Sequence, residues 1–310
     1  MVTGSKYFSS DEVELLVQRS DTRGFMLIGH CYGVIAVALL IFAIFPNLFT
    51  FVLTIMLIGS RQLGLAILMH DAAHGVLFER AKFNEIFGDW FCGSPILAEL
   101  NSYRRYHLKH HKHTQMDEDP DLVLSSPFPI TRLSLMRKFF RDLSGQTGVK
   151  LILIPRLKFL GKKIVNVGST GAEKQAQSFK SPRLVRPMIS NLFIFFSMWC
   201  FGEWWWWLVF WLVPLLTWFQ VVVRVRNIAE HAGTEFSSDQ LQNVRTTHTN
   251  FLTKLFVAPY WVNYHLEHHL MMYIPCWRLA AAHKLLLEKG CDPQLKLAKG
   301  YLAVLREVVV

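Results

Sequence analysis

Cysteine is scarce in this sequence and scattered along it. The 310 residues include five cysteines, Cys31, Cys92, Cys200, Cys276 and Cys291, and no two of them form a C-x-x-C pair. Such spacing indicates neither a disulfide framework nor a thiolate zinc site. We therefore expect these cysteines to be buried or unreactive thiols, and we look to other residue types for chemistry.

Charged residues are missing from two long stretches. No Asp, Glu, Lys or Arg occurs from Gly24 to Ser60, and residues 187–223 contain only Glu203. Because 52% of the residues are hydrophobic and the mean hydropathy exceeds zero, an ordinary soluble domain is excluded in favour of an integral membrane protein. Residues 1–20 are charged and lack the apolar core of a secretory signal, so we expect the N-terminus to be retained.

Each apolar stretch is interrupted near its middle, by Pro46-Asn47 in the first and by Gly202-Glu203 in the second. We expect two hairpins with four transmembrane helices, near residues 25–45, 48–69, 187–201 and 204–223. The tryptophans at the second turn, Trp199 and 204–207, are typical of interface anchors. Core helices of a soluble bundle are the alternative, and the length of both stretches disfavours it.

Positive charge falls on one side of this arrangement. The formal net charge is +10, and neither hairpin turn contains Lys or Arg. The positive-inside rule then places both termini and a cap of residues 70–186 and 224–310 in the cytoplasm. We expect residues 1–310 to form a single domain that comprises the spans and this cap. Such charge fits an anionic membrane leaflet, and we expect no nucleic-acid partner. Residues 86–97 and 148–160 are expected to be interfacial or re-entrant, and 161–181 form a stretch rich in Gly, Ser and Lys.

Histidines are numerous and clustered. Ten of the thirteen occur in four places: an H-D-A-A-H motif at 70–74, an H-x-x-H-H box at 107–111 followed by His113, a second such box at 265–269, and His231. Spacings of i, i+3 and i+4 are expected to bring the rings of a box to one helix face. Surface histidines could explain any one box, but they give no reason for the pattern to recur beside membrane exits.

Nine neutral imidazoles are too many for a single zinc ion, which normally has four ligands. They suit two metal ions of borderline softness, and iron fits if the chemistry is oxidative.

The motifs H70-D-A-A-H-G, H107-L-K-H-H and H265-L-E-H-H resemble, in order and spacing, the three histidine boxes of the membrane fatty acid desaturase and hydroxylase superfamily. Arg226-Asn-Ile-Ala-Glu-His231 resembles the extra histidine motif of that family, and the resemblance covers about residues 60–285. It implies an all-α integral membrane fold in which four transmembrane helices form two hairpins and a helical cytoplasmic cap holds a di-iron site.

The resemblance also implies the residues of the site. The nine iron ligands would be His70, His74, His107, His110, His111, His231, His265, His268 and His269. Asn227 matches a position that contacts the metal through a water molecule. Asp71, His113, Glu230 and Glu267 are expected around the ligands, whereas the acidic run 117–121 is interpreted as a solvated loop, with bracing of the site as the alternative. No catalytic residue is implied beyond the ligands.

The reaction implied by the resemblance is O2-dependent oxidation of an unactivated C–H bond in a fatty-acyl or lipid-like substrate. Desaturation is favoured, with hydroxylation and oxidative decarboxylation as alternatives on the same site. A non-catalytic membrane metal-binding or transport protein is the alternative of another class. That alternative predicts polar residues along the spans. The spans are nearly uncharged apart from Arg61, which disfavours it.

Electrons would come from a separate donor of the ferredoxin, rubredoxin or cytochrome b5 type with its reductase, because no H-P-G-G or C-x-x-C motif is present. The basic residues Arg104, Arg105, Lys109 and Lys112 are interpreted as a donor-docking surface or a contact with anionic lipid. Val76, Leu77, Leu100 and Tyr264 are expected to line a substrate tunnel. Arg245, His248 and Asn250 are interpreted as ordinary cap residues, with binding of a substrate head group as the alternative.

Overall fold

The computed structural model describes residues 6–156 and 184–310, and helices dominate this part of the chain. The stretch 161–181 lies outside the described residues, as does the end of the expected segment 148–160. In chain order the elements are α1 (Ser10–Leu16), α2 (Asp21–Ile44), α3 (Leu48–Ala73), α4 (Ala81–Phe87), α5 (Leu100–His113), α6 (Leu122–Ser125), α7 (Arg132–Leu143), α8 (Gln146–Gly148), α11 (Val185–Phe201), α12 (Val213–Leu216), α13 (Trp218–His231), β1 (Thr246–Thr247), α14 (Phe251–Phe256), α15 (His265–Leu270), α16 (Leu279–Glu288), β2 (Leu297–Ala298) and α17 (Tyr301–Glu307).

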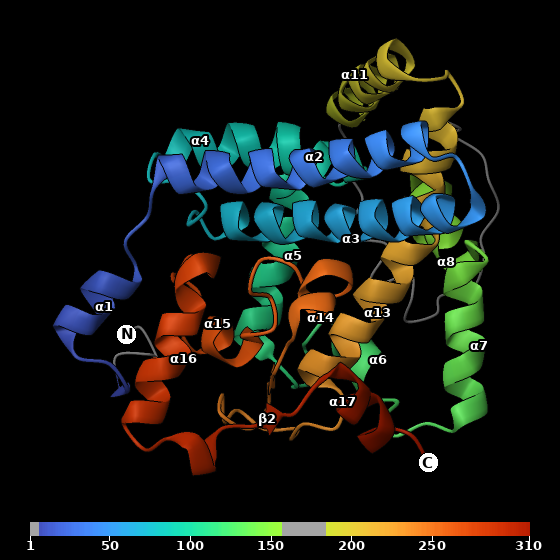
Figure 1. Cartoon of the computed structure of the whole chain (residues 1–310). Helices are drawn as coiled ribbons and strands as arrows, with labels where there is room; N and C mark the ends of the chain where they lie inside the picture. The colour runs from blue at the N-terminus through green and yellow to red at the C-terminus, as the bar shows by residue number, and fades with distance from the viewer. Residues whose placement is uncertain (1–5, 157–183) are drawn as a thin grey trace.

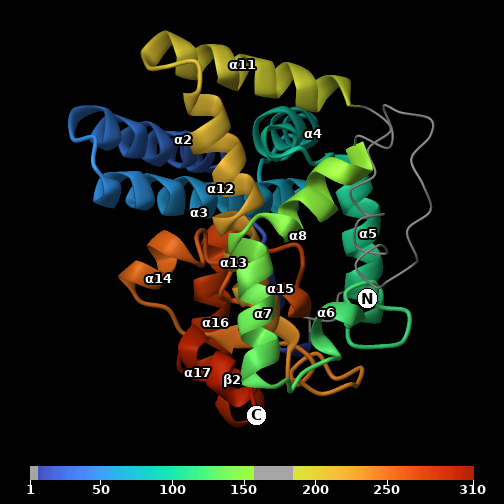
Figure 2. The ribbon, with the colours of Figure 1, turned by 90° about the vertical axis from the view of Figure 1, so that its right-hand side faces the viewer.

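The first hairpin forms as the sequence predicts. α2 and α3 run antiparallel side by side in both ribbon views (Figures 1 and 2). The turn falls at Pro46-Asn47, where the Asn47 side chain accepts a hydrogen bond from the backbone N–H of Thr50 and the Thr50 side chain accepts one from that of Asn47. This reciprocal cap fixes the start of α3. With 24 residues in α2 and 26 in α3, both helices are long enough to cross a bilayer.

The second hairpin differs in detail from the prediction. Its second arm is one helical path from Trp207 to His231, made of a π-helical segment (Trp207–Leu212), α12 and α13, so it begins later and ends later than the expected 204–223. The first arm, α11, has 17 residues. Within the described ranges, α2, α3 and the path 207–231 are long and apolar enough to span a membrane, and α11 is a shorter apolar helix.

α3 lies at the centre of the molecule. It is the most buried of the three long apolar helices, and its polar side chains bond to neighbouring backbone. Arg61 is 3% exposed and donates to the carbonyl oxygens of Leu255 at 2.8 Å and Lys254 at 3.3 Å, while Gln62 donates to the carbonyl of Trp211 at 2.7 Å. Arg61 therefore faces the protein interior.

The cap packs against one side of α3, with α5, α13, α15 and α16 beneath it in the view of Figure 1. β1 and β2 form a short parallel pair that joins the segment after α13 to the segment before α17. Arg245, next to β1, is buried and donates to the carbonyl of Ala229, and Asn250 caps α14 by accepting from Thr253. Both have structural roles, in line with their interpretation as ordinary cap residues.

The expected interfacial segment 86–97 is helical but irregular. α4 runs into a π-helical turn (Gly88–Gly93) and then a 3-10 turn (Ser94–Ile96). The Asp89 carboxylate in the π turn accepts from the backbone N–H of Leu100 at 3.1 Å, and it also pairs with Arg186 of α11. The segment therefore links α5, which carries a histidine box, to the second hairpin.

A buried ion pair fastens α7 to α13, two helices that lie side by side in Figure 2. Arg224 donates to both carboxylate oxygens of Asp142, with Nη2 at 2.8 Å from Oδ1, and the Asp142 side chain is fully buried. Thr147 also donates to Asp142 at 2.6 Å. Both oxygens of this carboxylate thus help to hold α7 and α8 against the end of the second hairpin.

We expect Asp142→Asn to lower the free energy of unfolding by ~2–4 kcal/mol, because it removes one partner of a buried ion pair while keeping its shape. Thermal unfolding in detergent should show a fall in Tm of several degrees. The matched control is Glu288→Gln, which breaks the exposed pair with Lys284 (78% and 54% exposed) and should cost less than about 0.5 kcal/mol. Equal melting temperatures for the two variants would contradict this role for Asp142.

Candidate metal centre

The H-D-A-A-H motif forms the last turn of α3. His70 lies within the helix and His74 is its C-cap residue, so both rings project from the same face with centroids 4.8 Å apart. The burial of α3 fixes the direction in which this face points.

The box at 107–111 lies at the end of α5, whose start is capped by Glu99 accepting from the backbone N–H of Ser102. Its three rings do not act as one set. His107 and His111 project together, with their Nε2 atoms 2.9 Å apart, whereas His110 points towards His231 and His269. On a helix, residues i+3 and i+4 lie about 100° apart around the axis, so one box can serve two sites.

The box at 265–269 divides in the opposite sense. α15 carries His265 and His269 towards His231, which ends α13, while His268 points to His70 and His111 with Nε2–Nε2 distances of 2.9 Å to each. In the box at 107–111 the i, i+4 pair, His107 and His111, lies with His70. In the box at 265–269 the i, i+4 pair, His265 and His269, lies with His231. The three rings of each box lie next to one another, as the spacing predicts, but they are divided between two groups.

The nine histidines thus form two groups. Within each group the ligand atoms all lie within 4.8 Å of one another. The first histidine group consists of His70, His74, His107, His111 and His268, and the second consists of His110, His231, His265 and His269. Four segments distant in the sequence contribute to this arrangement, and both boxes contribute to both groups.

The ring nitrogens fit the binding of metal ions. His111 Nε2 faces the Nε2 atoms of both His107 and His268 at 2.9 Å, which is close to the spacing of about 3 Å between two nitrogens bound at right angles to one ion. Both ring nitrogens of His74, Nε2 of His269 and Nδ1 of His231 are buried without a hydrogen-bond partner. Buried polar atoms are normally paired, so these atoms point to a ligand.

Burial also favours the neutral form of these histidines, which a metal ligand needs. It lowers the pKa of His74, His107, His111, His265, His268 and His269 well below the ordinary value, and the neighbouring imidazoles lower it further. Neutral imidazole is the form that coordinates metals. His110 differs: burial acts to lower its pKa, but a hydrogen bond to Asp119 and the carboxylates of Asp121 and Glu230 together raise it.

Carboxylates surround the two groups. Asp71 accepts from His70 Nδ1 at 3.2 Å and from the backbone N–H of Cys276 at 2.9 Å. A Glu230 oxygen lies 3.6 Å from His265 Nε2. Glu267 instead bonds to His283 at 2.6 Å and Thr246 at 2.5 Å, so it holds α15 in place without touching a histidine of either group.

Two expectations about this region need correction. His113 is partly exposed and lies 3.8 Å from Glu118, away from both histidine groups. The acidic run is not simply a solvated loop, because Asp119 is buried and accepts from His110 Nδ1 at 2.8 Å. Asp119 also accepts from the backbone N–H groups of Gln115 and Asp121, which shape the loop around it. Nothing in the sequence apart from its position after the box marked this residue.

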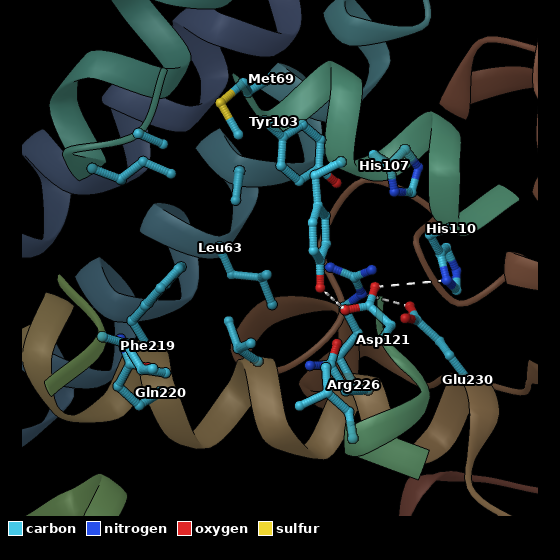
Figure 3. A pocket seen from close by; sticks show the side chains of 18 of the residues that line it. Leu63, Met69, Tyr103, His107, His110, Asp121, Phe219, Gln220, Arg226 and Glu230 are labelled. Atoms are coloured by element: carbon cyan, nitrogen blue, oxygen red, sulfur yellow. Dashed lines mark hydrogen bonds and ion pairs between the residues drawn. The ribbon is translucent and has the colours of Figure 1, made fainter. Parts of the chain in front are cut away.

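A cavity of ≈ 140 Å³ opens beside the second group (Figure 3). His107, His110, His231 and His265 line it, as does Asn227. The expected tunnel residues Val76, Leu77 and Leu100 are buried in the core and do not line this cavity. Tyr264 lines a smaller space of ≈ 20 Å³ on the other side of Arg226, next to His70 and His268.

The basic residues expected to form a docking surface divide between two roles. Arg104 is largely buried: it donates to the carbonyls of Ala72 and Ala73 and pairs with Glu85 at 2.5 Å, which supports the turn that carries His74. Arg105, Lys109 and Lys112 are exposed. Of this set, Arg104 is therefore a structural residue.

The geometry agrees with what comparison with known proteins shows. Residues 25–297 match the family model described as fatty acid desaturase. The chain is 26% identical to dihydrorhizobitoxine desaturase of Bradyrhizobium elkanii over 276 residues, which are 86% of this chain and 75% of that protein. It is 25% identical to an sn-1 oleoyl-lipid 12-desaturase of Synechocystis (74% of this chain, 66% of that protein) and 24% identical to a beta-carotene ketolase of Paracoccus (72% and 75%). This chain, with its long apolar helices and two buried histidine groups, belongs to the fatty acid desaturase family.

Proposed function

We propose that this protein is a membrane-bound, non-haem di-iron oxidoreductase that uses O2 to oxidise an unactivated C–H bond of a fatty-acyl or lipid-like substrate. The observation that carries the proposal is the division of nine buried or half-buried histidines into two groups, each with its ligand atoms within 4.8 Å. Family membership supports the oxidative class of reaction, since the relatives named above are desaturases and a ketolase.

Two ions account for the donor set better than one. Five imidazoles in the first group and four in the second exceed what a single zinc takes, and an oxidation that consumes electrons needs a redox metal. We assign His70, His74, His107, His111 and His268 to one iron and His110, His231, His265 and His269 to the other. Asn227, on the same face of α13 as His231, would contact the second iron through a water molecule.

When bound, the two irons supply the capacity to activate O2 and cleave a C–H bond with two external electrons. The chain supplies orientation and exclusion of water. Asp119 fixes the ring of His110 by accepting from Nδ1, which leaves Nε2 free to face the second group. Asp71 accepts from Nδ1 of His70, which leaves Nε2 of His70 free to face the first group. Because Asp71 also accepts from the Cys276 N–H, the end of α3 is held to the segment after α15.

Among the outcomes open to such a site, we propose desaturation, the reaction named for two of the three relatives. Hydroxylation or oxidative decarboxylation would use the same site. Electrons would come from a separate donor of the ferredoxin, rubredoxin or cytochrome b5 type with its reductase. We also propose that α11, whose 17 residues extend about 26 Å, forms a fourth span, so that the chain is one domain with both termini and the irons on the cytoplasmic side.

His268→Ala should disrupt the first group, because Nε2 of His268 contacts Nε2 of both His70 and His111. We expect iron to fall from about two ions per purified chain to about one or fewer. Lipids from expressing cells should lose a product that is two hydrogens lighter than its precursor. Metal analysis and mass spectrometry measure the two effects.

His113→Ala is the matched control for iron content, because His113 ends α5, the helix that carries the box at 107–111, but lies outside both groups. It should retain wild-type iron. If the wild-type protein held zinc or no metal after iron-replete growth, and cellular lipids were unchanged, the oxidase proposal would fail and a non-catalytic metal-binding role would replace it.

Asp119→Asn should weaken iron binding at the second group by about 10- to 100-fold, since it removes the charged acceptor that orients His110. Competition with a ferrous chelator measures this affinity. Asp117→Asn, in the exposed part of the same loop, should leave the affinity unchanged. If both variants released iron at the wild-type chelator concentration, Asp119 would have no orienting role.

A further inference from the structure

The cavity beside the second histidine group has two chemically different halves (Figure 3). Apolar side chains of α3 and of the path 207–231, including Leu63, Ala66 and Phe219, line one half. The other half, next to the histidines, contains Tyr106, Asp121, Arg226 and Glu230. A purely hydrocarbon substrate does not require such a polar wall.

All four polar groups have at least one partner within the protein. Tyr106 donates to Asp121, whose carboxylate also lies 3.7 Å from His110 Nδ1. Glu230 accepts from Arg226 Nε at 2.5 Å and lies 3.6 Å from His265. Arg226 is different, because this single bond to Glu230 uses only one side of its guanidinium. Within the described residues, its Nη1 and Nη2 atoms donate no hydrogen bond and form no ion pair.

The free edge of Arg226 faces the cavity. Its side chain is 17% exposed, it lines both the larger cavity and the smaller space next to His70, and Figure 3 shows it among the side chains that line the larger cavity, near Asp121 and Glu230. Water can satisfy these N–H groups when the cavity is empty. A hydrocarbon chain would displace that water and leave a buried cation with unpaired donors, which is costly.

A carboxylate removes this cost, because its two oxygens match the two parallel N–H donors of a guanidinium edge. The cavity volume sets the rest of the ligand. At ≈ 140 Å³ it is slightly smaller than the 150 Å³ of an apolar cavity known to take benzene, so it has room for a carboxylate with a short apolar segment. An 18-carbon chain would need considerably more space.

We propose that this cavity binds a free carboxylate of the substrate at the Nη edge of Arg226, with a short apolar segment between α3 and α13. The oxidised carbon then lies within a short apolar segment of the carboxylate, in contrast to mid-chain oxidation of a long lipid. The inference rests on the proposed function and narrows its substrate class to short-chain or carboxylate-proximal acids.

Equilibrium binding of radiolabelled octanoate to the full-length, iron-loaded protein in detergent tests the proposal, since octanoate is soluble enough to limit partition into micelles. The wild type should bind it saturably, and unlabelled octanoate should compete, whereas methyl octanoate and 1-octanol should not. Arg226→Gln should raise the Kd at least tenfold. The Kd of Arg226→Lys for octanoate should lie between those of the wild type and Arg226→Gln, because lysine keeps the charge but loses the bidentate geometry.

Arg156→Gln is the matched control. Arg156 is the other cation in the cavity wall: its Nη1 donates to the Ile152 carbonyl at 2.5 Å and its Nε is buried without a hydrogen-bond partner, so it is the competing candidate for the carboxylate. This variant should bind octanoate like the wild type. Ala66→Phe, which leaves Arg226 and Glu230 intact, should fill the apolar half and weaken octanoate binding more than butyrate binding. It therefore tests the same cavity even if loss of Arg226 disturbs folding.

Four results would overturn the inference: equal binding by wild type and Arg226→Gln, competition by methyl octanoate equal to that of octanoate, loss of binding in Arg156→Gln alone, or no saturable octanoate binding by protein that holds iron. Iron content measured on the same samples separates the two claims. Octanoate binding by a wild-type protein that takes up no iron would refute the oxidase and leave the carboxylate site standing.

Discussion

Nine imidazole rings packed in a protein interior without enough internal partners impose the main constraint on this structure. Several ring nitrogens face one another at 2.9–3.0 Å, and others are buried with no acceptor or donor within reach. In the absence of ligands such packing is unfavourable, because each ring loses its hydration. The arrangement becomes favourable when the nitrogens share metal ions, so the folded cap and the metal centre depend on each other.

The helices satisfy this constraint through their angular spacing. In each H-x-x-H-H box the i, i+4 pair serves one group and the i+3 residue serves the other, and the two boxes do so in opposite senses. α5 and α15 therefore each connect both metal positions. The buried α3 and the end of α13 supply the remaining rings, which ties the position of the apolar helices to the geometry of the centre.

The sequence allowed the first hairpin, the two interruptions and the four histidine segments to be predicted, because apolar length, turn residues and helical spacing are local properties. The division of each box between two groups was not predictable, since spacing along one helix does not say where the partner helices lie. The same holds for Asp119, which becomes a partner of His110 only because its loop folds back, and for Arg104, which looked like a surface cation. The tunnel residues were misplaced because Val76, Leu77 and Leu100 pack into the core instead of lining the cavity.

The most direct test of the central claim is anomalous diffraction at the iron absorption edge from crystals of the protein grown with iron. Our account predicts two separate peaks per chain, one surrounded by His70, His74, His107, His111 and His268 and the other by His110, His231, His265 and His269. A single peak, a peak remote from these rings, or no iron signal from iron-replete protein would contradict the assignment of two metal positions.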